Sequence, residues 1–213
     1  MKNEAILLLG PTGAGKTPLG DGLAERPLFG RRCIHFDFGA QLRQAAEHGC
    51  NGLSPNDIAT VRNVLMGGAL LEDDTFHIAH TILKVFMEEQ NAGVHDIIVL
   101  NGLPRHTGQA RDVDGILSVI LVVVLECTAE ITCARIAQNS GGDRTERTDD
   151  SLAEIERKLE IYAGRTRHLL EHYRNEGVPC FLVPIGVETT SADMLDILKQ
   201  AGAGFELQHA GQR

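Results

Sequence analysis

The stretch from residue 5 to residue 17 constrains the fold of this chain more than any other part of its sequence. Five apolar residues, AILLL (5–9), lead directly into GPTGAGKT (10–17), and a segment with helical spacing follows. Consecutive backbone N–H groups of such a glycine-rich loop point inward, and the N-terminus of the next helix adds a partial positive charge. A strand, a loop and a helix in this order predict a binding site for the phosphate groups of a nucleotide.

The loop fits the spacing G-x-x-x-x-G-K-[S/T], which is typical of ATP-binding chains. Lys16 can reach the β- and γ-phosphates of ATP, and the hydroxyl of Thr17 can bind Mg²⁺ directly or through water. A glycine-rich turn with an incidental lysine is the alternative, but the flanking strand and helix patterns favour a binding loop. We therefore expect ATP and Mg²⁺ as cofactors. The residues expected to bind the ATP phosphates are Gly10, Gly13, Ala14, Gly15, Lys16 and Thr17.

Short apolar runs recur along the chain between longer segments with helical spacing. The runs after the first are CIHF (33–36), IIVL (97–100), VILVVVL (119–125) and CFLVPI (180–185). They are unbroken rather than alternating, as expected for strands that are covered on both faces of a parallel sheet. Strands that alternate with helices predict an α/β fold. We expect a P-loop NTPase of three layers (α/β/α) with a five-stranded parallel sheet, an inserted helical acceptor flap and a short lid.

Two segments are too long or too irregular to be simple connections. Residues 39–91 have room for three helices, at 39–48, 55–66 and 73–91, which we interpret as the helical acceptor-binding flap above the sheet edge. Residues 139–150 are polar and rich in glycine and arginine, and we interpret them as the short lid. A long helical pattern follows over residues 151–177, with Leu152 in the apolar stripe that is expected to pack on the sheet. We expect one kinase domain over residues 1–213, with the flap and the lid as its subregions.

The composition argues against several kinds of partner. The formal net charge is −9, whereas a wide nucleic-acid surface needs a basic field. The longest apolar run is far shorter than the roughly 20 residues that span a bilayer as a helix, and no signal peptide is visible. We expect a cytoplasmic monomer with small-molecule nucleotide substrates and no nucleic-acid or membrane partner. The cysteines are odd in number and scattered, which favours buried, reduced thiols; they are Cys33, Cys50, Cys127, Cys133 and Cys180.

Three more motifs follow the phosphate loop. FDFGAQLRQA (36–45) is similar to S-T-G-D-x-L-R, and VLNGLPRHTGQA (99–110) is similar to D-G-F-P-R-T-x-x-Q-A. RTDD (147–150), with the helical pattern after it, is similar to R-x-D-D and R-L-x-x-Y-x-x-x-T-x-x-L-x-x-Y-Y. In this order, the motifs resemble those of the adenylate kinase group of nucleoside monophosphate kinases. The resemblance implies transfer of the γ-phosphoryl group of ATP to a nucleoside monophosphate.

The resemblance also implies which residues hold the acceptor. Arg43 and Arg105 would bind its phosphate, because planar guanidinium groups suit phosphate oxygens. Gln109 would read the edge of its base. The full set expected to line or bind the acceptor is Asp37, Phe38, Gly39, Arg43, Gly102, Arg105 and Gln109.

The lid and the helix before it would supply the remaining cations. By resemblance, Arg144, Arg147 and Lys158 would close over the phosphates and act in catalysis with Lys16 and Arg105. Arg135 would stack on the nucleotide base. The lid is short and contains no cysteine, so we expect no zinc. Two histidine pairs with helical spacing lack a third ligand and are interpreted as surface residues; they are His77 with His80 and His168 with His172.

The chain departs from the family pattern on the active side. Phe38 replaces a threonine of the acceptor pocket, and Ala40 and Asn101 each replace an aspartate. Asn139 and Lys158 stand where lid arginines are expected. The phosphate loop is intact, so these changes put in doubt the acceptor pocket and the order around Mg²⁺ rather than ATP binding.

Asp37 opens other interpretations. P-loop kinases of the shikimate and gluconate type carry an acidic residue just past the second strand, so a small metabolite with a hydroxyl group is an alternative acceptor. A catalytically degenerate nucleotide-binding switch is a third possibility, favoured by Asn101. We prefer the phosphate acceptor because Arg43 and Arg105 suit an anion. Asp37 would then bind Mg²⁺ through water, in place of the aspartate lost at Asn101.

Overall fold

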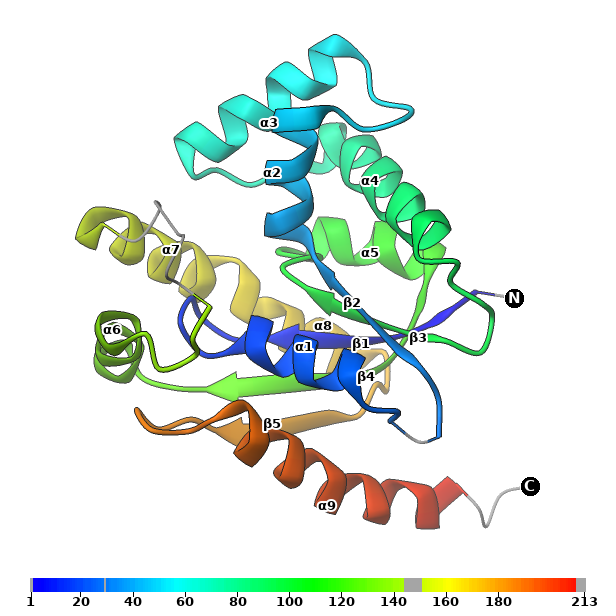
Figure 1. Ribbon diagram of the computed structural model, residues 1–213, viewed down its shortest axis with the longest axis vertical. Coiled ribbons are helices and arrows are strands. Elements are labelled where there is room, and N and C mark those ends of the chain that lie inside the picture. The colour runs from blue at the N-terminus through cyan, green and yellow to red at the C-terminus, as the bar shows by residue number, and fades with distance from the viewer. Residues whose placement is uncertain (1, 29, 144–150, 210–213) are drawn as a thin grey trace.

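A sheet of five parallel strands, formed by the part of the chain that the computed structural model describes, runs through the centre of the molecule (Figure 1). The described residues are 2–28, 30–143 and 151–209, with the backbone alone from residue 201. The strands lie in the order β2-β3-β1-β4-β5. They are β1 (Glu4–Leu9), β2 (Cys33–Asp37), β3 (Ile97–Asn101), β4 (Ser118–Glu126) and β5 (Cys180–Pro184). The predicted α/β fold is confirmed, and each predicted strand is present.

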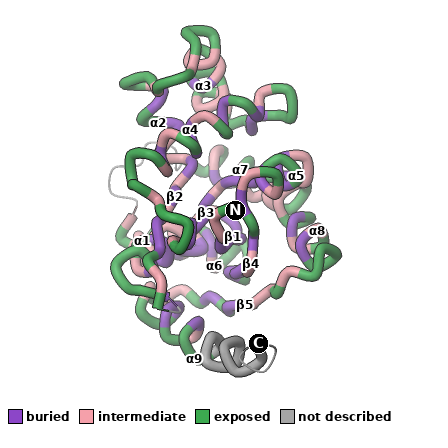
Figure 2. The backbone as a smooth tube through the Cα atoms, turned by 90° about the vertical axis from the view of Figure 1, so that its right-hand side faces the viewer, coloured by how far each residue is buried: buried purple, intermediate pink, exposed green. Residues whose placement is uncertain are grey.

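Helices cover both faces of the sheet, which explains why the strands are apolar without a break. Along β1, Ala5 and Leu7 belong to one hydrophobic core, whereas Ile6 and Leu8 belong to the other. Figure 2 shows buried residues along the strands and exposed ones on the surrounding helices. The first core is closed mainly by α4 (Phe76–Glu89), α5 (Thr107–Ile116) and α8 (Leu169–Asn175), and the second by α1 (Lys16–Glu25) and α9 (Ser191–His209).

The parallel strands bring their carboxyl ends to one edge of the sheet, where α/β folds bind ligands. β1 ends at Leu9 and leads into the phosphate loop, which leads into α1. β2 ends at Asp37, which pairs in register with Asn101 at the end of β3. The fold therefore places the phosphate loop beside two polar side chains that come from distant parts of the sequence.

Three helices lie between β2 and β3, as predicted, and they rise beyond the sheet edge (Figure 1). α2 (Phe38–His48) begins at Asp37, whose side chain caps it by accepting the N–H of Ala40. α3 (Pro55–Gly67) begins with a capping box between Ser54 and Asp57. A short 3₁₀ turn, Asp73–Thr75, leads into α4. These helices make up most of the flap, residues 39–91.

The segments after β4 differ from the predicted helices in two ways. After α6 (Ala129–Gln138), the pattern expected over residues 151–177 is two helices, α7 (Leu152–Gly164) and α8, joined by a 3₁₀ turn. Leu152 is exposed on the first turn of α7, so its predicted packing on the sheet is wrong. The last helix, α9, continues to His209.

The burial of the cysteines agrees only in part with the prediction made from the sequence. The five cysteines are free thiols, but Cys33 alone is buried and Cys133 is exposed on α6. The prediction that all five are buried is therefore wrong, because α6 keeps one face in solvent. Among the described residues, no helix is long and apolar enough to cross a membrane.

Replacing Phe36 tests the core that joins the sheet to the flap. Its ring lies 5.1 Å from that of Phe86 on α4 and 5.9 Å from that of Phe38, measured between centroids. Phe36→Ala should lower the free energy of unfolding by about 3–5 kcal/mol, because it leaves a cavity beneath the flap. Val94→Ala, at an exposed position, should change it by less than about 0.5 kcal/mol. Equal urea midpoints for the two variants would contradict this account of the core.

Candidate active site

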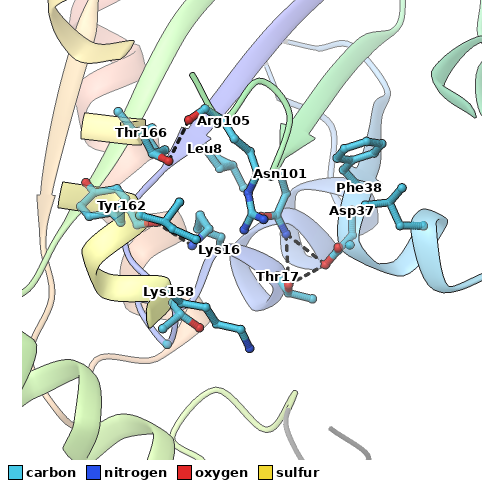
Figure 3. Close-up of a pocket in the computed structure, with 18 of the residues that line it drawn as sticks. Leu8, Lys16, Thr17, Asp37, Phe38, Asn101, Arg105, Lys158, Tyr162 and Thr166 are labelled. Carbon is cyan, nitrogen blue, oxygen red and sulfur yellow. Dashed lines mark hydrogen bonds between the residues drawn. The ribbon is translucent and has the colours of Figure 1, made fainter. Parts of the chain in front are cut away.

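The carboxyl ends of β1, β2 and β3 open into a cleft with about 1330 Å³ of empty space, its open mouth included. Its walls come from the phosphate loop, the flap, the turn after β3 and α7. Figure 3 shows Lys16, Arg105 and Lys158 extending into this space from three different elements.

The phosphate loop has the backbone that its glycines predict. Gly13 has a φ of 76° and Gly15, at the start of α1, a φ of 101°, both in the left-handed region that favours glycine. A Cβ on Gly13 would lie 2.7 Å from Cγ1 of Ile136, so α6 packs directly against the loop. Lys16 arches over it, with Nζ donating to the carbonyls of Gly10 (2.7 Å) and Pro11 (2.6 Å).

Three polar side chains meet beside the phosphate loop. Thr17 Oγ1 donates to Oδ2 of Asp37 at 2.8 Å, and Asn101 Nδ2 donates to the same oxygen at 3.1 Å. Asn101 Nδ2 also lies 3.0 Å from Thr17 Oγ1, so the three groups form a closed triangle. Asp37 Oδ1 accepts the N–H of Ala40 at 3.0 Å. The carboxylate thus joins α1, β3 and the start of the flap.

This triangle fits a magnesium ion that is bound together with nucleotide phosphates. Mg²⁺ prefers oxygen ligands and keeps several of its waters, using one or two protein oxygens beside substrate phosphates. The Thr17 hydroxyl and the Asp37 carboxylate supply such oxygens at the end of the phosphate loop. When bound, the ion neutralises charge on the β- and γ-phosphates. Asp37 would hold the waters of the ion, as predicted for it.

The acceptor side of the cleft combines exposed arginines with an apolar wall. Arg43 lines the cleft from α2, and Arg105 lines it from the turn after β3. Arg43 turns back along α2, because a Cβ on Gly39 would lie 3.6 Å from its Nη1. The backbone of Arg105 is held on both sides: its N–H donates to Gln109 Oε1 (2.8 Å), and its carbonyl accepts from Thr166 Oγ1 (2.9 Å). Phe38, Gly39 and Gly102 also line the cleft, as predicted.

The side chain of Gln109 makes its hydrogen bonds inside the protein. It is fully buried and does not line the cleft. Its Oε1 accepts from the Arg105 N–H, and its Nε2 donates to the Leu71 carbonyl at 2.9 Å. In this arrangement Gln109 positions the turn that carries Arg105 and ties it to the flap. The predicted reading of a base edge therefore gains no support from this structure.

Arg135 has a similar internal role. It is 2% exposed, and burial lowers the pKa of its guanidinium from the ordinary value. Nε donates to the Gly13 carbonyl at 3.0 Å, and Nη1 donates to three carbonyls between β5 and α9. These three acceptors are Gly186 (2.7 Å), Val187 (3.0 Å) and Thr189 (2.9 Å). Arg135 thus clamps the phosphate loop to the segment between β5 and α9, and stacking on a nucleotide base stays a prediction.

The lid can be described only in part. Lys158 and Tyr162 line the cleft from α7, and Asp143 lines it from the segment after α6. Asn139, in place of a lid arginine, ends α6 with a φ of 50°, a conformation that asparagine tolerates better than most residues. Arg144 and Arg147 lie outside the described residues, so their predicted roles remain predictions.

An ion pair that no sequence motif predicted joins the flap to the end of α7. Arg165 donates from Nη1 and Nη2 to both carboxylate oxygens of Glu72, at 2.6 and 2.8 Å. This hydrogen-bonded pair lowers the pKa of Glu72 below its ordinary value. Tyr162 and Thr166 also line the cleft, although they were not predicted to do so. The Y-x-x-x-T spacing in the resemblance was the available signal for these two.

The histidine pairs do not form metal sites in the described structure. His77 and His80 are exposed, and His77 pairs with Asp57 at 2.8 Å, which lowers the pKa of that carboxyl to about 2. His172 pairs with Asp114 at 3.0 Å. Within the described ranges, no three histidine, cysteine, aspartate or glutamate side chains lie together so that they could hold a metal ion.

No family model matches the chain, but a comparison with known proteins finds similar adenylate kinases. The chain is 29% identical over 180 residues to the adenylate kinase of Prochlorococcus marinus (strain MIT 9313), covering 82% of this chain and 87% of the relative. It is equally similar to an adenylate kinase of Thermus thermophilus, with 82% and 86% covered. The adenylate kinase of Deinococcus deserti is 26% identical over 186 residues, with 83% and 86% covered.

Replacing Arg135 tests whether this residue stabilises the fold or contacts a nucleotide base. Arg135→Ala should lower the free energy of unfolding by at least about 3 kcal/mol, because several hydrogen bonds from a charged donor are lost in a buried place. Urea unfolding measures the change, with Arg111→Ala, at an exposed position on α5, as the control. Wild-type stability of Arg135→Ala together with weakened ATP binding would instead support the base contact.

The ion pair between Glu72 and Arg165 should make stability depend on pH in the acid range. Its contribution is complete above the ordinary pKa of a glutamate, about 4.3, and is lost as the pH falls through the lowered pKa of Glu72. At pH 7, Glu72→Gln should lower the free energy of unfolding by about 0.2–1 kcal/mol, because both side chains are partly exposed. The difference should vanish well below pH 4. Glu171→Gln on α8 is the control, and a difference that persists at low pH would contradict the assignment.

Proposed function

Because this chain belongs to the adenylate kinase-type family of nucleoside monophosphate kinases, we propose that it transfers the γ-phosphoryl group of ATP to a nucleoside monophosphate. The observation that carries the proposal is one cleft with the phosphate loop on one side and Arg43 and Arg105 on the other. Such a cleft suits two phosphorylated ligands bound end to end. Phosphoryl transfer needs this in-line positioning more than it needs covalent chemistry from the protein.

The charges of the cleft fit two anionic substrates in a chain that is acidic overall. Lys16 lies in the phosphate loop, Arg43 and Arg105 line the acceptor side, and Lys158 lines the cleft from α7. The net charge of −9 means that these cations are a local feature and not part of a basic surface. Cations on both sides of the γ-phosphoryl group lower the repulsion between the two substrates and stabilise charge that develops during transfer.

The proposed step needs no general base. An acceptor phosphate has a second pKa near 6, so its oxygen is already an anion at neutral pH. This oxygen forms a bond to the γ-phosphorus while the bond from the γ-phosphorus to the bridging oxygen of ATP breaks. The negative charge of the attacking oxygen is transferred to the leaving ADP, and no proton has to be removed. Lys16 holds the ATP phosphates, and Arg105 aligns the attacking oxygen.

An alcohol acceptor is the second candidate, because Asp37 lines the cleft. Taking a proton from an alcohol requires a carboxylate that can accept it within hydrogen-bond reach. The N–H of Ala40, the hydroxyl of Thr17 and the amide of Asn101 already donate to Asp37. A carboxylate with these donors is better suited to capping α2 and ordering the Thr17 hydroxyl than to acting as a base, which favours the phosphate acceptor.

The base of the acceptor has an apolar surface on the flap side of the cleft. The aliphatic and aromatic residues that line it are Phe38, Leu42, Val64 and Leu65. Such side chains contact the face of a base and do not read its polar edge. Since both ends of the Gln109 amide are already paired, we propose that apolar contacts hold the base. An assay of phosphoryl transfer to each common monophosphate would identify the base of the acceptor.

The proposal predicts that Arg105→Ala loses transfer to a monophosphate while ATP binding stays near wild type. A charge-assisted bidentate contact is worth about 3 kcal/mol, so kcat/KM for the acceptor should fall by about a hundredfold. ADP release in the presence of ATP, Mg²⁺ and each monophosphate measures this. Arg111→Ala, which removes an exposed arginine from α5, is the matched control and should be unaffected.

Two further variants separate the alternatives. Lys16→Ala should abolish turnover with little change in unfolding, since Lys16 is only half-buried. If no monophosphate is phosphorylated but an alcohol is, and Asp37→Asn abolishes that reaction, the second candidate is correct. Binding of ATP without transfer to any acceptor would indicate a nucleotide-binding switch.

A further inference from the structure

A row of polar side chains connects the surface of α1 to the triangle of Thr17, Asp37 and Asn101. Asp21 Oδ1 lies 2.8 Å from Nδ1 of His35, and Nε2 of His35 lies 3.4 Å from Nδ2 of Asn101. The His35 side chain is only 7% exposed, whereas that of Asp21 is 62% exposed. None of the roles derived above uses Asp21 or His35, although they touch the site.

The fold brings this row together by simple spacing. Thr17 and Asp21 are four residues apart on α1 and therefore share one helix face. His35 and Asp37 are two residues apart on β2 and share one strand face, and Asp37 pairs in register with Asn101 on β3. Gly20 completes the arrangement, because a Cβ there would lie 2.3 Å from Nε2 of His35. Glycine at this position leaves the imidazole room between α1 and the sheet.

The contacts favour one tautomer of His35. With its proton on Nδ1, the ring donates to the Asp21 carboxylate and leaves Nε2 as an acceptor. Nε2 can take one hydrogen of the Asn101 NH₂ group, while the other hydrogen is directed at Thr17 and Asp37. A flipped amide would place Oδ1 of Asn101 against the lone pairs of Nε2 and of the Asp37 carboxylate. Both contacts would then be repulsive.

We propose that His35, oriented by Asp21, is a positioning residue that holds the Asn101 amide so that Thr17 and Asp37 are aligned for the Mg²⁺ of a bound nucleotide. The inference rests on the nucleotide site of the proposed function and not on the identity of its acceptor. It also explains why a histidine lies beside an asparagine at this position. A carboxylate at position 101 would present the same oxygen either way round, whereas an amide needs a partner that selects one orientation.

The test measures Mg²⁺-dependent binding of ADP without any acceptor. Thermal unfolding with ADP present is followed as free Mg²⁺ is raised, and the concentration at half of the stabilisation is compared among variants. His35→Leu removes the acceptor and should raise this concentration about tenfold, in line with the loss of groups that orient metal ligands. His35→Gln retains an amide oxygen that can accept from Asn101 and should stay within about threefold of wild type. ADP binding in the presence of a chelator should be the same in all of them.

Asp21→Ala gives an independent test at an exposed position, in case His35→Leu does not fold. It frees the imidazole to take the other tautomer and should raise the half-stabilising Mg²⁺ concentration about threefold or more. Glu25→Ala, an exposed acidic residue one turn further along α1, is the matched control and should match wild type. Equal Mg²⁺ dependence for folded His35→Leu, Asp21→Ala and wild type would overturn the inference, as would equal losses in His35→Leu and His35→Gln. Because no acceptor is present, either result leaves the question of monophosphate transfer to its own assay.

Discussion

The Asp37 carboxylate makes the contact on which the arrangement of the site depends. It accepts from Thr17 at the start of α1, from Asn101 at the end of β3 and from the first turn of α2. These segments are separated by up to 84 residues along the chain. One charged group therefore joins the phosphate loop, the central sheet and the flap. Hydrogen bonds to a charged group are about twice as strong as neutral ones, so a single carboxylate can define this junction.

Buried polar residues support the cleft from behind by holding backbone atoms. Arg135 binds carbonyls of the phosphate loop and of the segment after β5, and Gln109 binds the N–H of Arg105 and the Leu71 carbonyl. Both side chains hold backbone groups of segments that are distant from them in the sequence. The cations that face the cleft are then carried on rigid backbone while their own side chains stay accessible. This division explains why some motif residues lie inside the protein and others at its surface.

The sequence predicted the strands, the phosphate loop and the flap helices because each has a local signal. Apolar runs covered on both faces, glycines with positive φ and capping residues all leave a pattern within a few positions. The break between α7 and α8 left none, since the helical spacing continues across it. There Arg165 pairs with Glu72, which is 93 residues away. The internal roles of Gln109 and Arg135 were missed for the same reason, because their partners are mostly backbone carbonyls of distant segments.

The differences between this chain and the adenylate kinase sequence pattern become consistent when the ends of β2 and β3 are considered together. An aspartate is missing at Asn101, and one is present at Asp37 on the neighbouring strand, directly opposite in register. A carboxylate therefore still lies beside Thr17, although it comes from the neighbouring strand. In its new place it also caps α2, so the group that would order the cation's waters also fixes the start of the flap. Under the proposed function, binding of a metal–nucleotide complex and the orientation of the flap would therefore depend on the same side chain.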